Sequence, residues 1–243
     1  MSVLPAENLV WSLPLVRPSR TAMAIAPDGR TVVFAGTRNK VTQLYARTLD
    51  RAEANAIAGT EDAIAPFFSP DGAWIGFWTA NKIKKVPVGG GAVATICDLP
   101  NANISSASWA DDGSIFFANR ATVSKVSSAG GTSTPVVTAD ASKSERLLLV
   151  QALPGAKAIL FTSVLSFDWA TANLFVQSLD GSDRRVLMPG GSDARYVNTG
   201  HLLYMKSGSL MAVPFNVQSR QITGAPVALV EAVMHALNIP KRQ

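Results

Sequence analysis

Short apolar runs and polar turns alternate along the chain in a recurring pattern. In the clearest copy, Phe67-Phe68 leads into the turn Ser69-Pro70-Asp71-Gly72, and Trp74-Ile75-Gly76-Phe77-Trp78 follows the turn. Proline presets the backbone at the start of a turn, Asp hydrogen-bonds to the nearby backbone, and Gly accepts the positive φ that closes a hairpin. The stretch therefore predicts two antiparallel strands joined by a tight turn.

Four weaker copies of this stretch occur elsewhere in the chain. The turn glycines of the five copies follow one another at intervals of roughly 40–45 residues, which is the period of propeller blades. These glycines are Gly29, Gly72, Gly113, Gly155 and Gly200. The fourth copy departs from the pattern, because Leu153-Pro154-Gly155-Ala156 stands where the others have Pro-Asp-Gly or a similar turn.

Each turn is followed by a third apolar strand and then by a fourth, weaker one. Gln43 to Asp50 and Asn173 to Gly181 are the clearest third strands, and Val227-Ala228-Leu229-Val230 is a fourth. Each repeat is thus predicted to be a four-stranded antiparallel sheet. Because one such sheet cannot bury both faces alone, stacking of the sheets as propeller blades is favoured over a β-sandwich with coincidental turns.

The predicted organisation is a single all-β propeller domain over residues 1–243. The expected blades are 21–60, 61–100, 101–142, 143–190 and 191–230, with terminal segments 1–20 and 231–243. Five repeats allow a five-bladed ring, or a six-bladed ring whose last blade is incomplete. We expect Asn8 to Leu13 to pair as a strand near the last blade, and an uncovered edge would allow self-association.

Composition narrows the function classes. The chain is 47% apolar and 16% charged with a formal net charge of +5, and no long Lys/Arg block stands out, so nucleic-acid binding is not expected. The one cysteine, Cys97, excludes an internal disulfide and a cysteine zinc site. We see neither an apolar run long enough to span a membrane nor a signal peptide in this sequence.

The sequence offers little for catalysis. His201 and His235 are the only imidazoles, and we find neither a Gly-x-Ser-x-Gly nucleophile motif nor metal-ligand spacing. The adjacent carboxylates Asp111 and Asp112 fall in a repeat turn, where a structural role is expected. We therefore predict that the protein is not an enzyme and has no catalytic residues, cofactor or metal.

Polar residues before each blade are the better candidates for binding. In a propeller these inter-blade loops, together with the loops between second and third strands, gather at the mouth of the central channel. The longest second-to-third loop is expected over Ser163 to Ala172, with Phe167, Asp168 and Trp169. Trp169 could instead pack on its own blade, and the polar loops could merely line a water-filled channel. The candidate partner-binding residues are Glu61, Asp62, Asn103, Glu145, Arg146, Asp168, Trp169, Asp193 and Arg195.

The Ser-Pro-Asp-Gly turn between inner strands resembles the repeat of TolB-type, or WD40-like, β-propellers. More narrowly, five stretches resemble the propeller behind the catalytic domain of some bacterial serine/threonine protein kinases: residues 43–50, 66–72, 191–197, 200–204 and 208–215. The resemblance covers roughly Thr21 to Val230. It implies a bacterial repeat protein, allows a periplasmic or other extracytoplasmic placement, and carries over no kinase activity, because the kinase motifs are not found in this sequence.

The sequence as a whole predicts a non-catalytic binding module, a scaffold or sensor that takes a protein or small ligand at the channel mouth. It could be a stand-alone relative or a fragment of a kinase-linked propeller. The alternatives are a propeller enzyme, such as a lyase, cyclase or hydrolase, or the accessory propeller of a larger kinase or peptidase.

Overall fold

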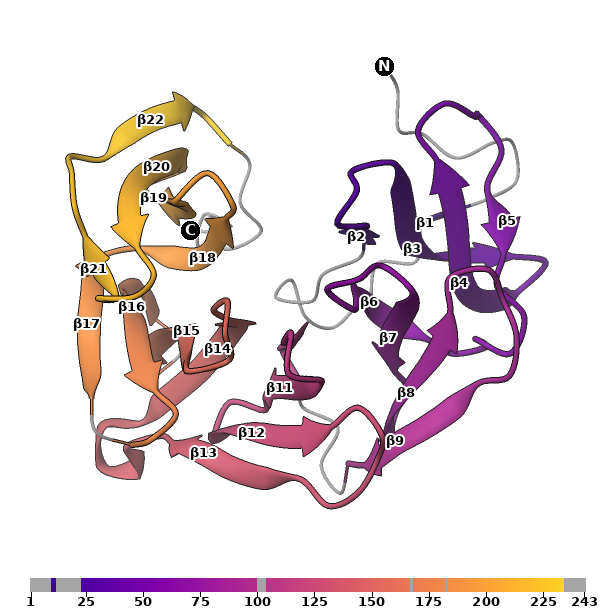
Figure 1. The fold of residues 1–243 in the computed structure, drawn as a ribbon, viewed down its shortest axis with the longest axis horizontal. Coiled ribbons are helices and arrows are strands. Elements are labelled where there is room, and N and C mark those ends of the chain that lie inside the picture. The colour runs from indigo at the N-terminus through magenta and orange to yellow at the C-terminus, as the bar shows by residue number, and fades with distance from the viewer. Residues whose placement is uncertain (1–9, 12–22, 100–103, 167, 182, 234–243) are drawn as a thin grey trace, which may run out of the picture. The chain divides into compact units, whose positions relative to one another are not determined.

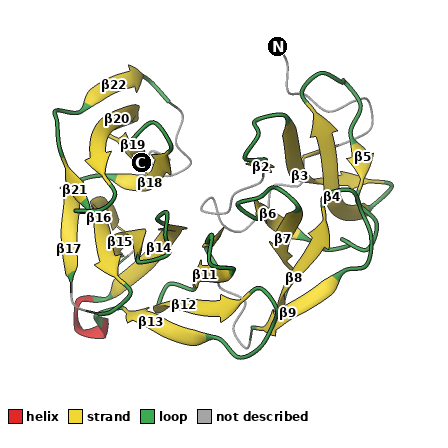
Figure 2. Cartoon of the chain, in the orientation of Figure 1, coloured by secondary structure: helices red, strands yellow, loops and turns green. Residues whose placement is uncertain are grey.

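The computed structural model describes residues 10–11, 23–99, 104–166, 168–181 and 183–233. These residues form an all-β propeller of five blades, in which each blade is an antiparallel sheet with four strand positions (Figures 1 and 2). One three-residue 3-10 helix, η1 (Ala141–Lys143), is the sole helix among them. The predicted fold class is therefore confirmed. No helix in the described ranges is long and apolar enough to cross a membrane.

The chain divides into two compact units, Met1–Ala102 with Val126–Ser133, and Asn103–Lys125 with Thr134–Gln243. The first unit contains the first two blades. Blade 1 consists of β1 (Val10–Trp11), β2 (Met23–Ile25), β3 (Thr31–Arg38), β4 (Val41–Thr48) and β5 (Asn55–Ala56). Blade 2 consists of β6 (Ile64–Phe68), β7 (Trp74–Trp78), β8 (Lys82–Pro87) and β9 (Ala94–Asp98).

The turn between β6 and β7 shows why the repeat needs its residues. The Ser69 hydroxyl donates to Asp71 Oδ1 at 2.5 Å, and the same oxygen accepts from the Ala73 N–H at 3.0 Å. The hydrogen bond from Ser69 is the main reason that the pKa of Asp71 is lowered. Gly72 has a φ of +71°, which only glycine adopts readily. The turn is thus held by its own side chains.

The core of the first unit lies between its two blades. Alternate side chains of β3 and β4 pack on alternate side chains of β7 and β8, as expected for strands with one face toward a neighbouring sheet. This cluster includes Val33, Leu44, Ile75, Phe77 and Val86, which are all fully buried.

The second unit contains the fourth and fifth blades and most of the third. Blade 3 consists of β10 (Ser106–Trp109), β11 (Ser114–Ala118), β12 (Thr122–Ser127) and β13 (Thr134–Thr138). Blade 4 consists of β14 (Glu145–Ala152), β15 (Ala158–Leu165), β16 (Asp168–Ser178) and β17 (Arg184–Pro189). Blade 5 consists of β18 (Ser192–Val197), β19 (His201–Lys206), β20 (Ser209–Asn216), β21 (Gln221–Ile222) and β22 (Val227–Val230).

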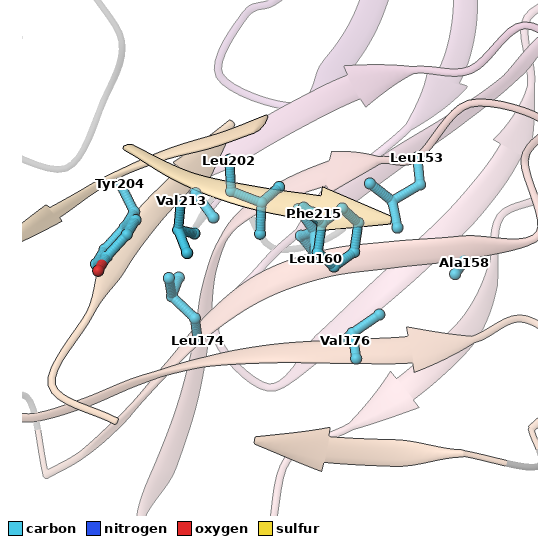
Figure 3. Close-up of a cluster of buried hydrophobic side chains, with 10 residues drawn as sticks. Leu153, Ala158, Leu160, Leu174, Val176, Leu202, Tyr204, Val213 and Phe215 are labelled. Atoms are coloured by element: carbon cyan, nitrogen blue, oxygen red, sulfur yellow. The ribbon is translucent and has the colours of Figure 1, made fainter. Parts of the chain in front are cut away.

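Blades 4 and 5 enclose a cluster of buried hydrophobic side chains in the second unit. Leu202, Val213 and Phe215 of blade 5 face Leu160 and Leu174 of blade 4 (Figure 3). Hydrogen bonds join neighbouring innermost strands as well. The Ser106 hydroxyl accepts from the Val150 N–H at 2.7 Å, which links β10 to β14. Blade 4 is therefore anchored on both of its faces within this unit.

The sheets of blades 1 and 5 each contain five strands, but two short strands share one position in each sheet, so that both sheets keep four strand positions. β1 and β2 both pair with β3, at its two ends, and β21 and β22 both pair with β20. Val10 lies opposite Thr37, and Trp11 lies opposite Gly36, so the predicted N-terminal strand belongs to blade 1. The expectation that it pairs near the last blade was wrong, because β2 occupies only Val32 to Phe34 on this edge of β3, and the rest of the edge is open to a second segment. The rest of Asn8 to Leu13 lies outside the described residues.

The outermost strand of blade 5, β22, is apolar, and its side chains are exposed. Val227 and Leu229 are 60% and 54% exposed. Such an edge suits self-association, which stays a prediction, as does the assignment of residues 1–243 to a single domain.

Candidate functional site

A polar site forms at one end of blade 4, where the chain enters β14 from η1. The turn begins at Asp140, whose Oδ1 accepts from the Ser142 N–H at 3.0 Å and from the Ser142 hydroxyl at 2.5 Å. Its other oxygen pairs with Lys143 Nζ at 3.0 Å. The Ser142 hydroxyl, and after it Lys143, lower the pKa of Asp140 from 3.8 to about 2. Asp140 is therefore a fixed negative charge near neutral pH.

Glu145, the first residue of β14, is the buried acid of the site. Its carboxylate pairs with the Arg184 guanidinium from β17, and its Oε1 also accepts from the Ser163 hydroxyl at 2.6 Å. Its Oε2 accepts from the Asp140 N–H at 2.7 Å. One buried carboxylate thus ties together the entry turn, β15 and β17, which is the condition under which a buried charge is tolerated.

Arg184 is held by two aromatic rings. Its guanidinium carbon lies 5.4 Å from the centre of the Phe161 ring and 4.9 Å from that of Phe175. The two rings stack with their centres 5.4 Å apart. Cation–π contact and the ion pair with Glu145 fix the direction of this side chain.

These groups line a cavity of about 310 Å3 beside the end of blade 4 that carries η1 and the β15–β16 turn, which we call the loop end of the blade. The Arg184 side chain comes to the cavity from the start of β17, which pairs with the other end of β16. The four charges in the cavity wall balance one another, since Asp140 and Glu145 oppose Lys143 and Arg184. The wall combines charged, amide, hydroxyl and apolar groups, and consists of Asp140, Lys143, Glu145, Ser163, Leu165, Thr171, Asn173, Phe175 and Arg184.

The predicted loop from Ser163 to Ala172 is mostly strand. β15 continues to Leu165 and β16 begins at Asp168, and these two residues pair across a tight turn. The Thr171 hydroxyl accepts from the Leu165 N–H at 2.8 Å and donates to the Asp168 carbonyl at 2.6 Å, which closes the hairpin. The expectation of a long loop was therefore wrong.

The predicted residues on this hairpin have separate positions. Asp168 is exposed beside the turn. Trp169 is half-buried against the cluster of Leu148, Leu149, Val164 and Ala172 on its own blade, as the competing interpretation held. Phe167 lies outside the described residues.

Of the other predicted residues that the structure describes, Glu145 alone lines the cavity. Arg146 follows it and donates to the Glu145 carbonyl at 2.9 Å. Asp193 and Arg195, at the start of blade 5, form an ion pair of 2.8 Å with each other. The Asp193 N–H also donates to the Thr162 hydroxyl of blade 4 at 3.0 Å, so this pair lies next to β15.

The remaining predicted residues belong to other parts of the chain. Glu61 and Asp62 are exposed in the first unit, where the Asp62 N–H donates to the Thr42 carbonyl at 2.8 Å. Asn103 lies outside the described residues. The two acids in the turn of the third repeat form hydrogen bonds with the backbone: Asp111 accepts from the Gly155 N–H at 2.8 Å, and Asp112 accepts from the Ser114 N–H at 2.8 Å.

Sequence reasoning missed Arg184, Lys143 and Ser163. Arg184 is 39 residues from its partner Glu145, and only strand pairing brings the two together. One signal was present: Arg184-Arg185 opens an otherwise apolar fourth strand. A cation at that position has to find an acid or solvent at the blade edge.

Asp140 provides a prediction about pH. Because the folded-state pKa is depressed, the stabilising contribution of this carboxylate is present above about pH 4 and is lost as the pH falls through about 2. Carboxyl NMR should show a midpoint near 2. Ser142→Ala should move the midpoint up toward 3.8, whereas Lys157→Ala, which changes a distant residue, should leave it in place. A midpoint near 3.8 in the unmodified protein would contradict the geometry of the turn.

The blades and turns define a β-propeller, and comparison with solved structures supports this fold. No family model and no curated sequence matches the chain. Among solved structures, TolB from Acinetobacter baumannii superposes with a TM-score of 0.64 at 14% identity, over 88% of this chain and 55% of the other. The chain thus spans about half of that protein.

Two further structures show the same fold. A protein assigned as TolB from Agrobacterium tumefaciens gives a TM-score of 0.63 at 15% identity, over 86% of this chain and 79% of the other. A streptogramin B lyase gives 0.59 at 15% identity, over 88% and 71%. The chain therefore shares the β-propeller fold of these structures, and this fold also occurs in an enzyme. The narrower resemblance to kinase-linked propellers stays a prediction.

Proposed function

We propose that this protein is a non-catalytic binding module that takes a side chain or short segment of a protein partner into the cavity on blade 4. The observation that carries the proposal is that both acids in that cavity are held in place by ion pairs and hydrogen bonds. Glu145 and Asp140 each have a cationic partner and at least two hydrogen-bond donors. The wall is therefore a set of fixed, oriented charges of the kind that binding sites use for recognition.

The same features argue against proton transfer at this site. A general acid or base works best when its pKa lies near the working pH. The Ser142 hydroxyl and Lys143 hold the pKa of Asp140 at about 2, far below that range. Glu145 is occupied by Arg184 and Ser163. The cavity supports a recognition role better than a catalytic one.

The shape of the site favours a protein partner. A cavity of about 310 Å3 is at the lower limit of the sizes that enclose a drug-like ligand, so it suits an inserted side chain or short segment. Its rim carries Lys143, whose side chain is 69% exposed, and the partly exposed apolar Leu165. The rim is held by paired strands, so little entropy is lost when a partner docks.

The test is a charge reversal at the rim with a matched control on the same blade. Lys143→Glu replaces a rim cation, whereas Lys157→Glu makes the same change in the exposed turn before β15, at the opposite end of that strand. A partner captured from the source cells should bind the first variant about tenfold more weakly, since one lost charge-assisted contact is worth roughly 1.5–3 kcal/mol. The control should bind as the unmodified protein does.

Two results would contradict the proposal. Equal binding by both variants would place the partner elsewhere. A change in the intact mass of the partner during incubation, abolished by one substitution in this protein, would show an enzyme. An unchanged partner mass together with selective loss in Lys143→Glu supports the binding module.

A further inference from the structure

A second cavity lies in the first unit, far along the chain from the blade 4 site. Its volume is about 420 Å3, and it lies where β3 begins and β4 ends, beside the glycine turn that follows β8. Three of its wall residues are charged: Arg47, Arg51 and Glu53. The remaining residues are Thr31, Ala46, Thr48, Asn55, Ala56, Ile57, Ala58, Val88, Gly89 and Gly90.

Arg47 is the unusual member of this wall. It is only 8% exposed, yet the one side-chain hydrogen bond that it forms with the described residues is from Nε to the carbonyl of Arg51, at 2.7 Å. Within the described part of the chain, Arg47 forms no ion pair. A buried guanidinium carries a permanent charge, and burying a charge without a partner is costly. Its terminal amino groups therefore remain available to an anion.

Comparison with blade 4 shows that the fold of a blade does not require a cation at the position that Arg47 occupies in blade 1. The stretch Leu44 to Asp50 in β4 and the following turn aligns residue for residue with Leu174 to Asp180 in blade 4. Gln177 occupies the position of Arg47, is equally buried at 7% exposed, and donates to the Ser178 carbonyl at 3.1 Å. Gly181 occupies the position of Arg51. A neutral side chain therefore satisfies the fold at this position.

The other two charged residues of the wall, Arg51 and Glu53, determine which charge the cavity favours in a ligand. Arg51 is exposed and adds a second positive charge next to Arg47. It is partly balanced by Asp50, whose pKa is lowered mainly by the Thr48 hydroxyl and to a smaller extent by Arg51. Glu53 is exposed and forms no ion pair with any described residue. With one more cation than acid in its wall, the cavity favours an anionic group that lies next to a hydrogen-bond donor.

We infer that this cavity binds a small molecule through a carboxylate or phosphate group, with Arg47 as the main ligand-binding residue. The planar fork of an arginine matches two oxygens of either group, and such paired contacts are among the strongest hydrogen bonds in proteins. Arg51 would add a second contact at the rim, and Glu53 would accept from a donor on the ligand. A volume of about 420 Å3 falls within the usual range for small-molecule sites.

The experiment measures ligand binding by calorimetry and by the shift in melting temperature at constant ionic strength. The probes are inorganic phosphate, succinate and the uncharged analogue succinamide. The variants are Arg47→Gln, which copies the residue that blade 4 uses at this position, and Lys157→Gln, which removes one positive charge from an exposed turn of the second unit. Both variants should keep the far-UV circular dichroism of the unmodified protein.

We expect one of the two anions to bind and to raise the melting temperature, with succinamide inactive. Phosphate as the stronger probe would point to a phosphate ester, and succinate to an organic acid. Arg47→Gln should weaken that binding by about tenfold or more, whereas Lys157→Gln should not change it. Equal binding by Arg47→Gln, equal binding of succinamide, or no response to either anion would overturn the inference. None of these results bears on the blade 4 cavity, which is tested by a protein partner.

Discussion

Replacing Glu145 with alanine is expected to lower the free energy of unfolding by about 3 kcal/mol. The substitution leaves the Arg184 charge without its partner and removes the acceptor of the Ser163 hydroxyl and of the Asp140 N–H. This loss lies at the low end for a broken buried pair, because Arg184 is still 29% exposed and water can reach it. For a domain of this size the melting temperature should fall by about 6–12 °C.

A double-mutant cycle separates the ion pair from simple loss of packing. Glu145→Gln keeps an acceptor oxygen at nearly the same volume and should cost less than alanine. Arg184→Met keeps much of the apolar stem between Phe161 and Phe175 and removes the charge. With both charges gone, Glu145→Gln combined with Arg184→Met should cost less than the sum of the single changes. Additive effects would show that the two residues do not act as a pair.

Gly76→Ala is expected to destabilise the protein by about 2 kcal/mol through overpacking. A Cβ on Gly76 would lie 2.2 Å from Cζ of Phe67, the residue opposite it on the neighbouring strand β6. Phe67 is buried, so its ring has to leave its position to make room. The effect comes from this contact, because Gly76 does not have a positive φ. Urea denaturation would measure it.

Gly89→Ala is the matched control in the same unit. Gly89 also lacks a positive φ, and a Cβ there would meet no atom within 4 Å. Its free energy of unfolding should change by no more than about 0.5 kcal/mol. Combining Gly76→Ala with Phe67→Ala should cost less than the two single changes together, since the shorter side chain removes the clash. Equal effects at Gly76 and Gly89 would contradict the packing of β6 on β7.

The fold could be predicted from the sequence because its turns are local. Ser69, Asp71 and Gly72 bond to one another within a few residues, so their identities are visible in a short window. Even the fourth copy, which lacks the Asp, keeps its turn, because Gly155 and Ala156 both adopt positive φ and the Ala156 N–H donates to the Leu153 carbonyl at 3.1 Å. Regular spacing of such turns is sufficient to identify a propeller.

The site was less predictable because its contacts are long-range. Glu145 was recognised as a polar residue that enters an inner strand, but its burial depends on Arg184. The Arg184-Arg185 pair signals a cation at the edge of an apolar strand, but it does not indicate which acid that cation meets. The length of the β15–β16 hairpin depends on the Thr171 hydroxyl, a single side chain that bridges both strands. The partner of β1 depends on which sheet edge is free, a property of the folded chain.

The two cavities differ in what they offer a ligand. The blade 4 cavity has balanced, mutually paired charges, whereas the blade 1 cavity has a buried guanidinium that no described acid neutralises. The first suits a neutral or mixed polar segment of a protein, and the second suits an anionic small molecule. The two proposals can therefore fail independently.

Docking of a partner on the loop end of blade 4 can be measured by hydrogen–deuterium exchange with the captured partner. We expect slower exchange on binding at residues 140–146 and 168–173, with unchanged exchange at the turns around Asp28, Asp71 and Asp112. Protection of those turns, with residues 140–146 and 168–173 unaffected, would contradict it.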